Sequence, residues 1–254
     1  MRYFLIFTLL FFSACSNSQN SDEVAKEENR VIRVAVAANV SFAIIELSKE
    51  FKKDFPNTDL QITLGSSGKL SAQIINKAPF DIFMSANTNY PEKLFAEGIG
   101  LKKPKIYANG SLVLLSMTER DFSNGFQIFE TEKFNKIAIA NPKTAPYGFA
   151  SVEVLQNLGL FQKLEDKFVY GESIGQTFTY ATKVTDIGFV AKSQLFGEDF
   201  RDLIEGKNWF EIPPHLYSPI SQGALVLTEN GKDFYNFLLS EKGKKVLKDF
   251  GYSF

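Results

Sequence analysis

The sequence predicts an α/β fold of mostly parallel sheets flanked by helices. Short runs of small and β-branched residues, typical of buried strands, alternate with longer stretches whose apolar residues recur at helical spacing. Between them lie loops rich in glycine, serine, asparagine or proline. The 254 residues suffice for one large domain or for two smaller domains, each with a hydrophobic core.

The first predicted unit is a strand over residues 31–38 followed by a helix that ends before Pro56. Asn39 stands where the strand gives way to the helix. Asparagine is a preferred residue at helix N-caps, and we expect Asn39 to cap this helix. A helix N-terminus carries unpaired N–H groups and about half a positive elementary charge, which makes it a natural seat for an anion.

The second unit is a strand over residues 60–64, a Gly65-Ser66-Ser67-Gly68 turn and a helix. The Gly68-Lys69 pair is not a phosphate-binding loop, because that motif needs four residues between its glycines and Ser or Thr after the lysine. Next we expect a strand over 82–84, a short helix over 91–97, and strands over 105–107 and 112–116.

The second half repeats the pattern. We expect a strand over 137–140, a loop over 141–148 and a helix that Gly159 ends. A strand over 168–170, a helix over 174–183 and a buried strand over 187–190 follow. The aromatic and proline-rich segment 208–219 is expected to be irregular. A strand over 224–227 and one amphipathic helix over 231–250 complete the chain.

Four loops of this pattern are expected at the carboxyl ends of strands, where parallel sheets bind their ligands. They lie at Asn39, Ser67, Tyr147 and Ile174. A lone Asn39 or Ser67 is more often a simple cap or turn residue. The repeated strand–loop–helix pattern favours a shared anion site.

Composition excludes several classes of function. The formal net charge of −1 argues against a nucleic-acid-binding protein. A single cysteine, Cys15, excludes an internal disulfide, and a single histidine, His215, argues against a zinc site. His215 follows two prolines, which is typical of a surface loop. We find no Gly-x-Ser-x-Gly nucleophile motif and no paired carboxylates, so we expect no enzyme activity and no cofactor.

The N-terminus has the features of a targeting segment. Residues 1–15 combine Arg2, an apolar run too short to span a bilayer, and the small residues before Cys15. This segment resembles a bacterial lipoprotein signal peptide, which implies lipidation of Cys15. The alternative is an ordinary secretory peptide cleaved nearby. Residues 16–30 are polar and charged, and we expect a flexible tether.

The ordered motifs resemble the periplasmic molybdate-binding proteins of ABC importers, a family of type II two-lobed solute-binding proteins. The matching stretches are VAVAAN (34–39), GSSGKL (65–70), APFDIFMSA (78–86), ANP (140–142) and PYG (146–148). The resemblance implies two α/β lobes with the ligand cleft between them. Lobe one comprises residues 31–107 and 222–254, and lobe two comprises residues 108–221.

The resemblance also implies the ligand contacts. Asn39 and Ser67 of the first lobe bind the oxyanion, Tyr147 of the second lobe contributes to the site, and Ile174 gives its backbone N–H. Some members carry a tyrosine where this chain has Ala191, and we expect the Tyr147 phenol to replace that hydroxyl.

The function implied is capture of molybdate, and also of tungstate, for delivery to an ABC permease. We further expect a monomer at the periplasmic or outer face of a bacterial membrane, held there by the lipid on Cys15 that the signal-like N-terminus implies. Three alternatives stay open at this point: a binding protein for sulfate, phosphate or another oxyanion, an enzyme of phosphate or sulfate chemistry, and a structural lipoprotein without a ligand.

Overall fold

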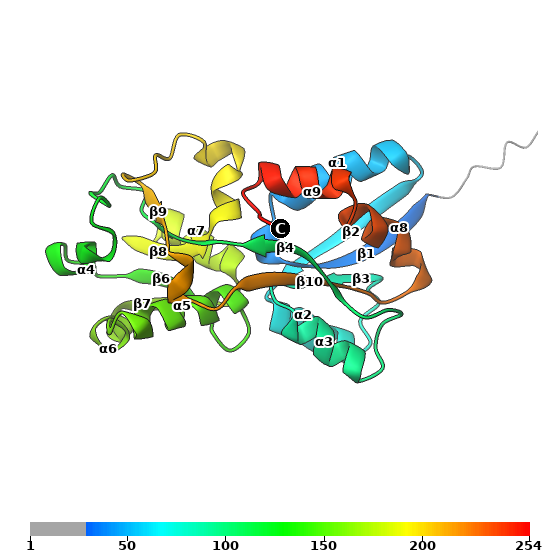
Figure 1. The fold of residues 1–254 in the computed structure, drawn as a ribbon, viewed down its shortest axis with the longest axis horizontal. Helices are drawn as coiled ribbons and strands as arrows, with labels where there is room; N and C mark the ends of the chain where they lie inside the picture. The colour runs from blue at the N-terminus through cyan, green and yellow to red at the C-terminus, as the bar shows by residue number, and fades with distance from the viewer. Residues whose placement is uncertain (1–28) are drawn as a thin grey trace, which may run out of the picture.

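The chain forms two lobes, each built on its own five-stranded sheet flanked by helices (Figure 1). The structure is a computed structural model that describes residues 29–254. The predicted signal peptide with Cys15, and residues 16–28 of the predicted tether, lie outside the described residues. The two-lobed α/β architecture expected from the sequence is confirmed.

The first sheet has the strand order β2-β1-β3-β10-β4. β1 pairs in parallel with β2 and β3, and β10 runs antiparallel to β3 and β4. The carboxyl ends of β1, β2 and β3 therefore meet at one edge of the sheet. The strands are β1 (Arg30–Ala37), β2 (Thr58–Gly65), β3 (Ile82–Met84), β4 (Lys105–Gly110) and β10 (Ile220–Val226).

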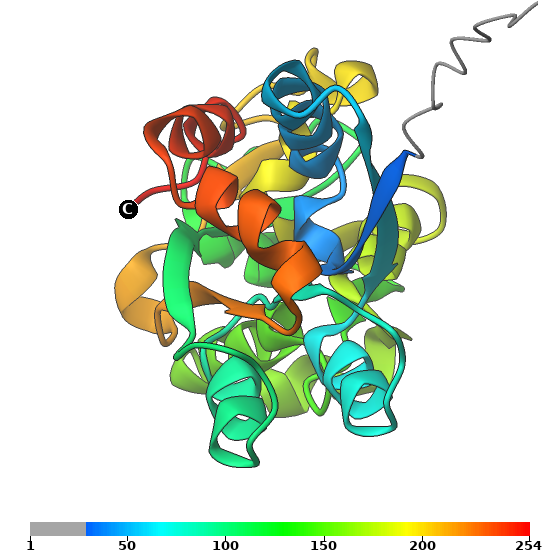
Figure 2. The same ribbon diagram turned by 90° about the vertical axis from the view of Figure 1, so that its right-hand side faces the viewer.

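Alternate residues of β1 bury opposite faces of this sheet, as the two-residue period of a strand requires. Ile32, Val34 and Val36 share one core with α1, α8 and α9, whereas Ala35 shares another with α2 and α3. Figure 2 shows these two layers of helices on the two sides of the sheet. The helices are α1 (Ala43–Asp54), α2 (Ser67–Ile75), α3 (Asn89–Ala96), α8 (Lys232–Leu238) and α9 (Glu241–Asp249).

The second sheet repeats this design with the order β7-β6-β8-β5-β9. β6 pairs in parallel with β7 and β8, and β5 runs antiparallel to β8 and β9. The strands are β5 (Leu112–Leu115), β6 (Ile137–Ala140), β7 (Phe168–Gly171), β8 (Ile187–Ala191) and β9 (Trp209–Glu211). The α-helices of this lobe are α4 (Ile128–Thr131), α5 (Pro146–Asn157), α6 (Phe161–Leu164) and α7 (Ile174–Lys183).

Short 3₁₀ turns complete the described part of the chain. They are η1 (Ala38–Val40), η2 (Gly125–Gln127), η3 (Glu165–Lys167), η4 (Lys192–Phe196), η5 (Glu198–Phe200), η6 (Pro214–Leu216) and η7 (Glu229–Gly231). Within residues 29–254, no helix is long and apolar enough to span a bilayer.

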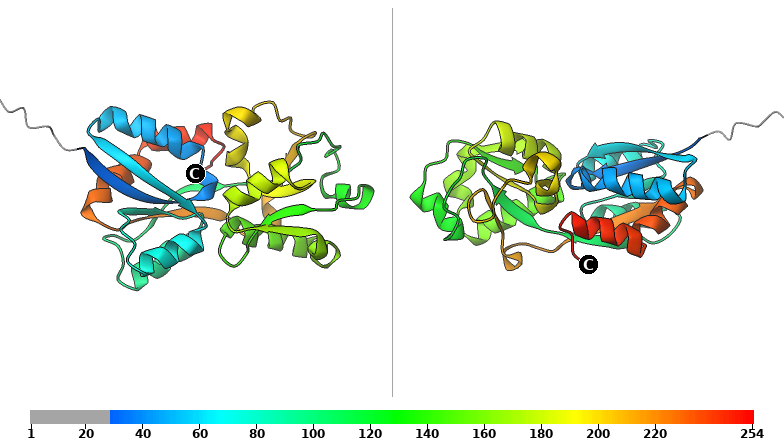
Figure 3. Two further views of the ribbon diagram at one scale, coloured as in Figure 1. Left: turned by 180° about the vertical axis from the view of Figure 1, so that it is seen from behind. Right: turned by 90° about the horizontal axis from the view of Figure 1, so that it is seen from above.

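The chain passes between the sheets at Ser111, which separates β4 from β5, and at residues 212–219, which separate β9 from β10 (Figure 3). The C-terminal tail returns to the first of these passages. Asn109 and Ser253 exchange two backbone hydrogen bonds, at 2.7 and 3.0 Å. The tail thereby brings Tyr252 into the interior between the lobes, where it is buried.

Two sequence expectations were wrong in detail. Segment 208–219 is not irregular throughout, because it contains β9, whose backbone pairs with β5. The helix expected over 231–250 is split into α8 and α9. The Ser240 hydroxyl donates to the carbonyl of Phe237 at 2.6 Å and accepts from the N–H of Gly243 at 3.3 Å, so it ends one helix and caps the next.

Candidate functional site

Five chain segments that follow strands of the two sheets enclose one small cavity between the lobes. The residues that line it are Ala37, Ala38, Asn39, Gly65, Ser66, Ser67, Ala86, Ala145, Pro146, Tyr147 and Ile174. All four residues singled out in the sequence are among them. The space open to the centre of a water-sized sphere is ≈ 10 Å³. This is about the space of one water-sized sphere, whereas cavities for drug-sized ligands span about 300–1,000 Å³.

Three α-helices begin at this cavity. α2 starts at Ser67, α5 at Pro146 and α7 at Ile174, and all three residues line the cavity. The first N–H groups of a helix have no partner within the helix, and the helix dipole makes this end positive. Three such ends converging from two lobes favour a negatively charged ligand without any charged side chain.

Ser67 is fully buried at the first position of α2. Its Oγ accepts a hydrogen bond from the backbone N–H of Ala86 at 2.9 Å. A serine hydroxyl carries one hydrogen and two lone pairs. Because one lone pair is occupied, the Ser67 hydrogen stays available for an acceptor in the cavity.

Ser66 is a site residue that the sequence did not single out. Its hydroxyl is buried, lines the cavity and has no hydrogen-bond partner among the described residues. As the N-cap of α2 it also makes no side-chain capping bond. A buried polar group without a partner costs free energy and calls for an explanation, such as a ligand. The sequence could have indicated Ser66, because two adjacent serines stand in the turn between a strand and a helix.

Asn39 lies at the cavity but does not cap an α-helix, so that expectation was wrong. It sits in the 3₁₀ turn η1, and α1 begins only at Ala43, after the N-cap residue Phe42. The reason is that its side-chain amide forms hydrogen bonds with residues distant in the sequence. Nδ2 donates to Gln222 Oε1 at 2.8 Å and to Tyr252 Oη at 2.9 Å. Its Oδ1 is buried without a partner among the described residues.

Tyr147 comes from the second lobe, at the start of α5, and is fully buried. Gln222 Nε2 donates to its phenolic oxygen at 3.4 Å. Gly110 of β4 makes this approach possible, because a Cβ there would collide with the Tyr147 hydroxyl. Burial raises the pKa of Tyr147 well above its usual range, and the nearby Tyr252 and Tyr107 raise it further.

Tyr252 belongs to the same buried set of hydroxyls. Burial raises the pKa of Tyr252 to about 12, although hydrogen bonds to Ser193, Asn39 and Gln222 oppose the rise. Burial likewise raises the pKa of Tyr107 well above its usual range. All three tyrosines beside the cavity therefore keep their hydrogens at neutral pH and act as hydrogen-bonding groups without charge.

Ile174 begins α7, which Ser173 caps by accepting from the N–H of Gln176 at 3.3 Å. Only the backbone of Ile174 offers polar groups to the cavity. Its carbonyl accepts from Gln194 Nε2 at 3.3 Å, which fixes this end of the helix in place. Gly175, the next residue, lies close to Ala38 of the first lobe.

The lobes are closed on each other around the cavity. The N–H of Gly68 donates to the carbonyl of Thr144 in the opposite lobe at 2.9 Å. Ser193 of the second lobe donates to the carbonyl of Asn39 at 2.8 Å. Across the rim, Lys69 and Glu172 form an exposed ion pair at 3.0 Å. These contacts join the two lobes around the cavity.

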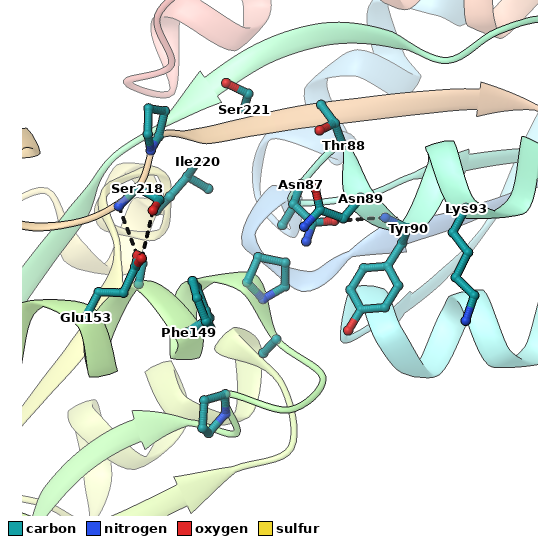
Figure 4. Close-up of a pocket in the computed structure, with 16 residues that line it drawn as sticks. Asn87, Thr88, Asn89, Tyr90, Lys93, Phe149, Glu153, Ser218, Ile220 and Ser221 are labelled. Carbon is teal, nitrogen blue, oxygen red and sulfur yellow. Dashed lines mark hydrogen bonds between the residues drawn. The ribbon is translucent and has the colours of Figure 1, made fainter. Parts of the chain in front are cut away.

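A larger groove, ≈ 560 Å³ on the same measure, lies beside the cavity (Figure 4). Tyr90 and Lys93 face it from the first lobe, and Phe149 and Glu153 face it from the second. Its Glu153 carboxylate accepts from the backbone N–H and the hydroxyl of Ser218 at 2.9 and 2.7 Å. The convergent helix ends lie at the smaller cavity, which we therefore take as the candidate site.

Comparisons with known proteins identify a family and several relatives of this chain. The sequence profile of the bacterial extracellular solute-binding proteins matches residues 32–253. A molybdate-binding protein of Azotobacter vinelandii is 37% identical over 229 residues, which cover 87% of this chain and 89% of the relative. The solved periplasmic molybdate-binding protein of A. vinelandii has a TM-score of 0.81 at 31% identity, covering 88% of this chain and 99% of that one.

A more distant relative has a name that includes the word lipoprotein. A Bacillus subtilis protein, whose name assigns it provisionally to the substrate-binding lipoproteins of ABC transporters, is 28% identical over 250 residues. The match covers 96% of this chain and 94% of the relative.

Proposed function

The chain belongs to the family of bacterial extracellular solute-binding proteins, and we propose that it captures molybdate between its lobes and delivers it to an ABC importer. One observation carries this proposal. A single cavity at which three α-helices begin is lined by Asn39, Ser67, Tyr147 and Ile174, which come from both lobes.

The chemistry of the cavity suits a tetrahedral dianion. Molybdate has four oxygens that accept hydrogen bonds and carries no proton at neutral pH. Burying such an ion costs free energy unless its oxygens are hydrogen-bonded. We assign this role to the hydroxyls of Ser66, Ser67 and Tyr147, and to the N–H groups at Asn39 and Ile174. Each hydrogen bond to a charged group contributes about 1.5–3 kcal/mol.

A site of neutral donors also suits a transport receptor. The ion is held by several moderate interactions from two lobes rather than by a permanent counter-charge, so opening the lobes breaks many of them together. Tungstate has the same charge and shape, and we propose that it binds as well. The family relationship and the donor set give no support to a catalytic role.

We propose further that the protein is anchored by a lipid on Cys15 at the outer face of a membrane, with residues 16–30 as a tether and the globular part acting as a monomer. The lipoprotein-like sequence before Cys15 supports this, as does the lipoprotein name of the B. subtilis relative. The test is the Cys15→Ser variant in cells. The wild type should partition with membranes and incorporate labelled palmitate, and the variant should do neither.

Isothermal titration of residues 16–254 with molybdate, tungstate, sulfate and phosphate tests the main proposal. Tight one-to-one binding of molybdate and tungstate alone is the expected result, with loss of binding in the Ser67→Ala/Tyr147→Phe double variant. A preference for sulfate or phosphate would change the proposed substrate but leave the proposed site in place. Absence of binding to all four anions would contradict a role as an oxyanion receptor.

A further inference from the structure

Gln222 has no assigned role in the site, yet it connects the groups behind it. It lies on β10, the strand that brings the chain back to the first sheet, and it is fully buried. Its Oε1 accepts from Tyr107 Oη at 2.7 Å and from Asn39 Nδ2 at 2.8 Å. Its Nε2 donates to Tyr147 Oη at 3.4 Å, the longest of these contacts.

We propose that Gln222 is a positioning residue that makes the Tyr147 hydroxyl a hydrogen-bond donor to the bound oxyanion. This inference rests on the proposed function. A phenol has one hydrogen and can point it either toward the protein or toward a ligand. The nitrogen of a side-chain amide can only donate hydrogen bonds. When Gln222 Nε2 donates to the phenolic oxygen, the Tyr147 hydrogen is left for the anion.

The orientation of the Gln222 amide follows from a chain of hydrogen bonds that starts at a backbone carbonyl. The carbonyl of Asn39 can only accept, and Tyr252 Oη donates to it at 3.1 Å. Tyr252 has thereby used its hydrogen, so it accepts from Asn39 Nδ2. The same Nδ2 group faces Gln222, which must present Oε1 rather than Nε2.

A reversed Gln222 amide would place two donors against each other at Asn39. It would also place Oε1 beside Tyr147, where it would take the phenolic hydrogen away from the ligand. Anion binding by Tyr147 would then be lost even though the ring had not moved. The hydrogen-bond network therefore determines whether the uncharged Tyr147 hydroxyl acts as a donor or as an acceptor toward the ligand.

The contact also links the hydroxyl to lobe closure. Gln222 and Asn39 belong to the first lobe, whereas Tyr147 stands on α5 of the second. When the lobes separate, Tyr147 leaves Gln222, and its hydroxyl is free to rotate. Closure thus restores both the position of the phenol and the direction of its hydrogen.

A simpler role is that Gln222 only satisfies Tyr107 and Asn39 and so stabilises the fold. The two roles differ in a double-mutant cycle. Titration of molybdate into residues 16–254 is carried out for the wild type, Tyr147→Phe, Gln222→Met and the double variant. We expect Tyr147→Phe to weaken binding by at least about 10-fold in the wild type and by less than about 3-fold beside Gln222→Met.

Gln194→Met is the matched control. Gln194 is also a buried glutamine at the site, but it contacts Ala191 and Ile174 instead of Tyr147. Tyr147→Phe should keep its full effect in that background. An equal effect in the Gln222→Met background would overturn the proposal.

Gln222→Glu provides a second test if Gln222→Met does not fold. An ionised carboxylate has only acceptors, so it would take the phenolic hydrogen of Tyr147 away from the ligand. At pH 8, Tyr147→Phe should therefore weaken molybdate binding by less than about 3-fold beside Gln222→Glu. A full effect of Tyr147→Phe in that background would overturn the proposal. If the wild type binds no oxyanion at all, the proposed function falls, and this inference falls with it; if it binds and the cycle is additive, only the inference falls.

Discussion

The hydroxyl oxygen of Ser67 accepts the backbone N–H of Ala86 at 2.9 Å. Both residues line the cavity, and the bond crosses from the start of α2 to the end of β3. It fixes the Ser67 oxygen in position and leaves its hydrogen available to a ligand that accepts. A cavity that orients its hydroxyls in this way is prepared to receive an acceptor.

Ser67→Ala should therefore weaken molybdate binding by about 10- to 150-fold, the loss expected for one hydrogen bond to a charged group. Isothermal titration measures this directly. Ser71→Ala is the control, because Ser71 is buried one turn further along the same helix and does not line the cavity. An unchanged affinity in Ser67→Ala would remove Ser67 from the site.

Ser66→Ala should also weaken binding, by several-fold to about 100-fold, because the buried Ser66 hydroxyl has no partner among residues 29–254 and the ligand is its remaining acceptor. The melting temperature of the ligand-free protein should change little, since no protein hydrogen bond of the Ser66 hydroxyl is lost. Reduced stability with unchanged affinity would identify Ser66 as a purely structural residue.

Gly68→Ala should separate stability from binding. Gly68 lies in α2, where alanine is favoured over glycine by up to about 1 kcal/mol. The added Cβ would however lie 3.1 Å from the backbone of Thr144 in the opposite lobe and 2.7 Å from the Tyr90 hydroxyl. We expect an equal or higher melting temperature without ligand and a weaker affinity for molybdate.

The opposite outcome would contradict this prediction. If closure around the ligand does not need the contact between α2 and Thr144, the affinity of Gly68→Ala for molybdate will equal or exceed that of the wild type. Small-angle scattering with and without molybdate then shows whether the variant still closes.

Local sequence patterns predicted most of the strands and helices, whereas the division into two lobes came from the family resemblance. Strands and helices were placed by residue periodicity, and α7 begins and ends at the residues expected. Asn39, Ser67, Tyr147 and Ile174 were brought together for a topological reason. Each follows a strand whose parallel partners end at the same sheet edge, and the two edges face each other across the cleft.

The groups behind the site were not predictable in this way. Gln222 and Tyr252 reach Asn39 from 183 and 213 residues away in the sequence. Gln222 lies before the strand expected over 224–227 and Tyr252 lies after the helix expected over 231–250, so neither was given a role. The cap predicted at Asn39 failed for the same reason, because its amide is held by these distant partners rather than by the next turn.

The last prediction concerns the stability of the second lobe at low pH. Asp186 accepts the backbone N–H groups of Asn135 and Lys136 at 2.7 and 3.0 Å. The N–H of Lys136, with a smaller contribution from that of Asn135, lowers the pKa of Asp186, although partial burial opposes this. A lowered pKa in the folded state means that the carboxylate contributes stability above its unfolded pKa, about 3.9, and loses it as pH falls through the folded value.

Asp186→Asn should accordingly reduce the free energy of unfolding by about 1 kcal/mol at pH 7, a modest value because solvent screens this partly exposed group. The difference from the wild type should narrow as pH falls below about 4, where Asp186 of the unfolded chain gains its proton before the folded carboxylate does. Urea unfolding at pH 7 and pH 3 measures both values. Asp199→Asn, at an exposed position, is the control, and an Asp186→Asn effect that grows toward pH 3 would contradict the role of the carboxylate charge.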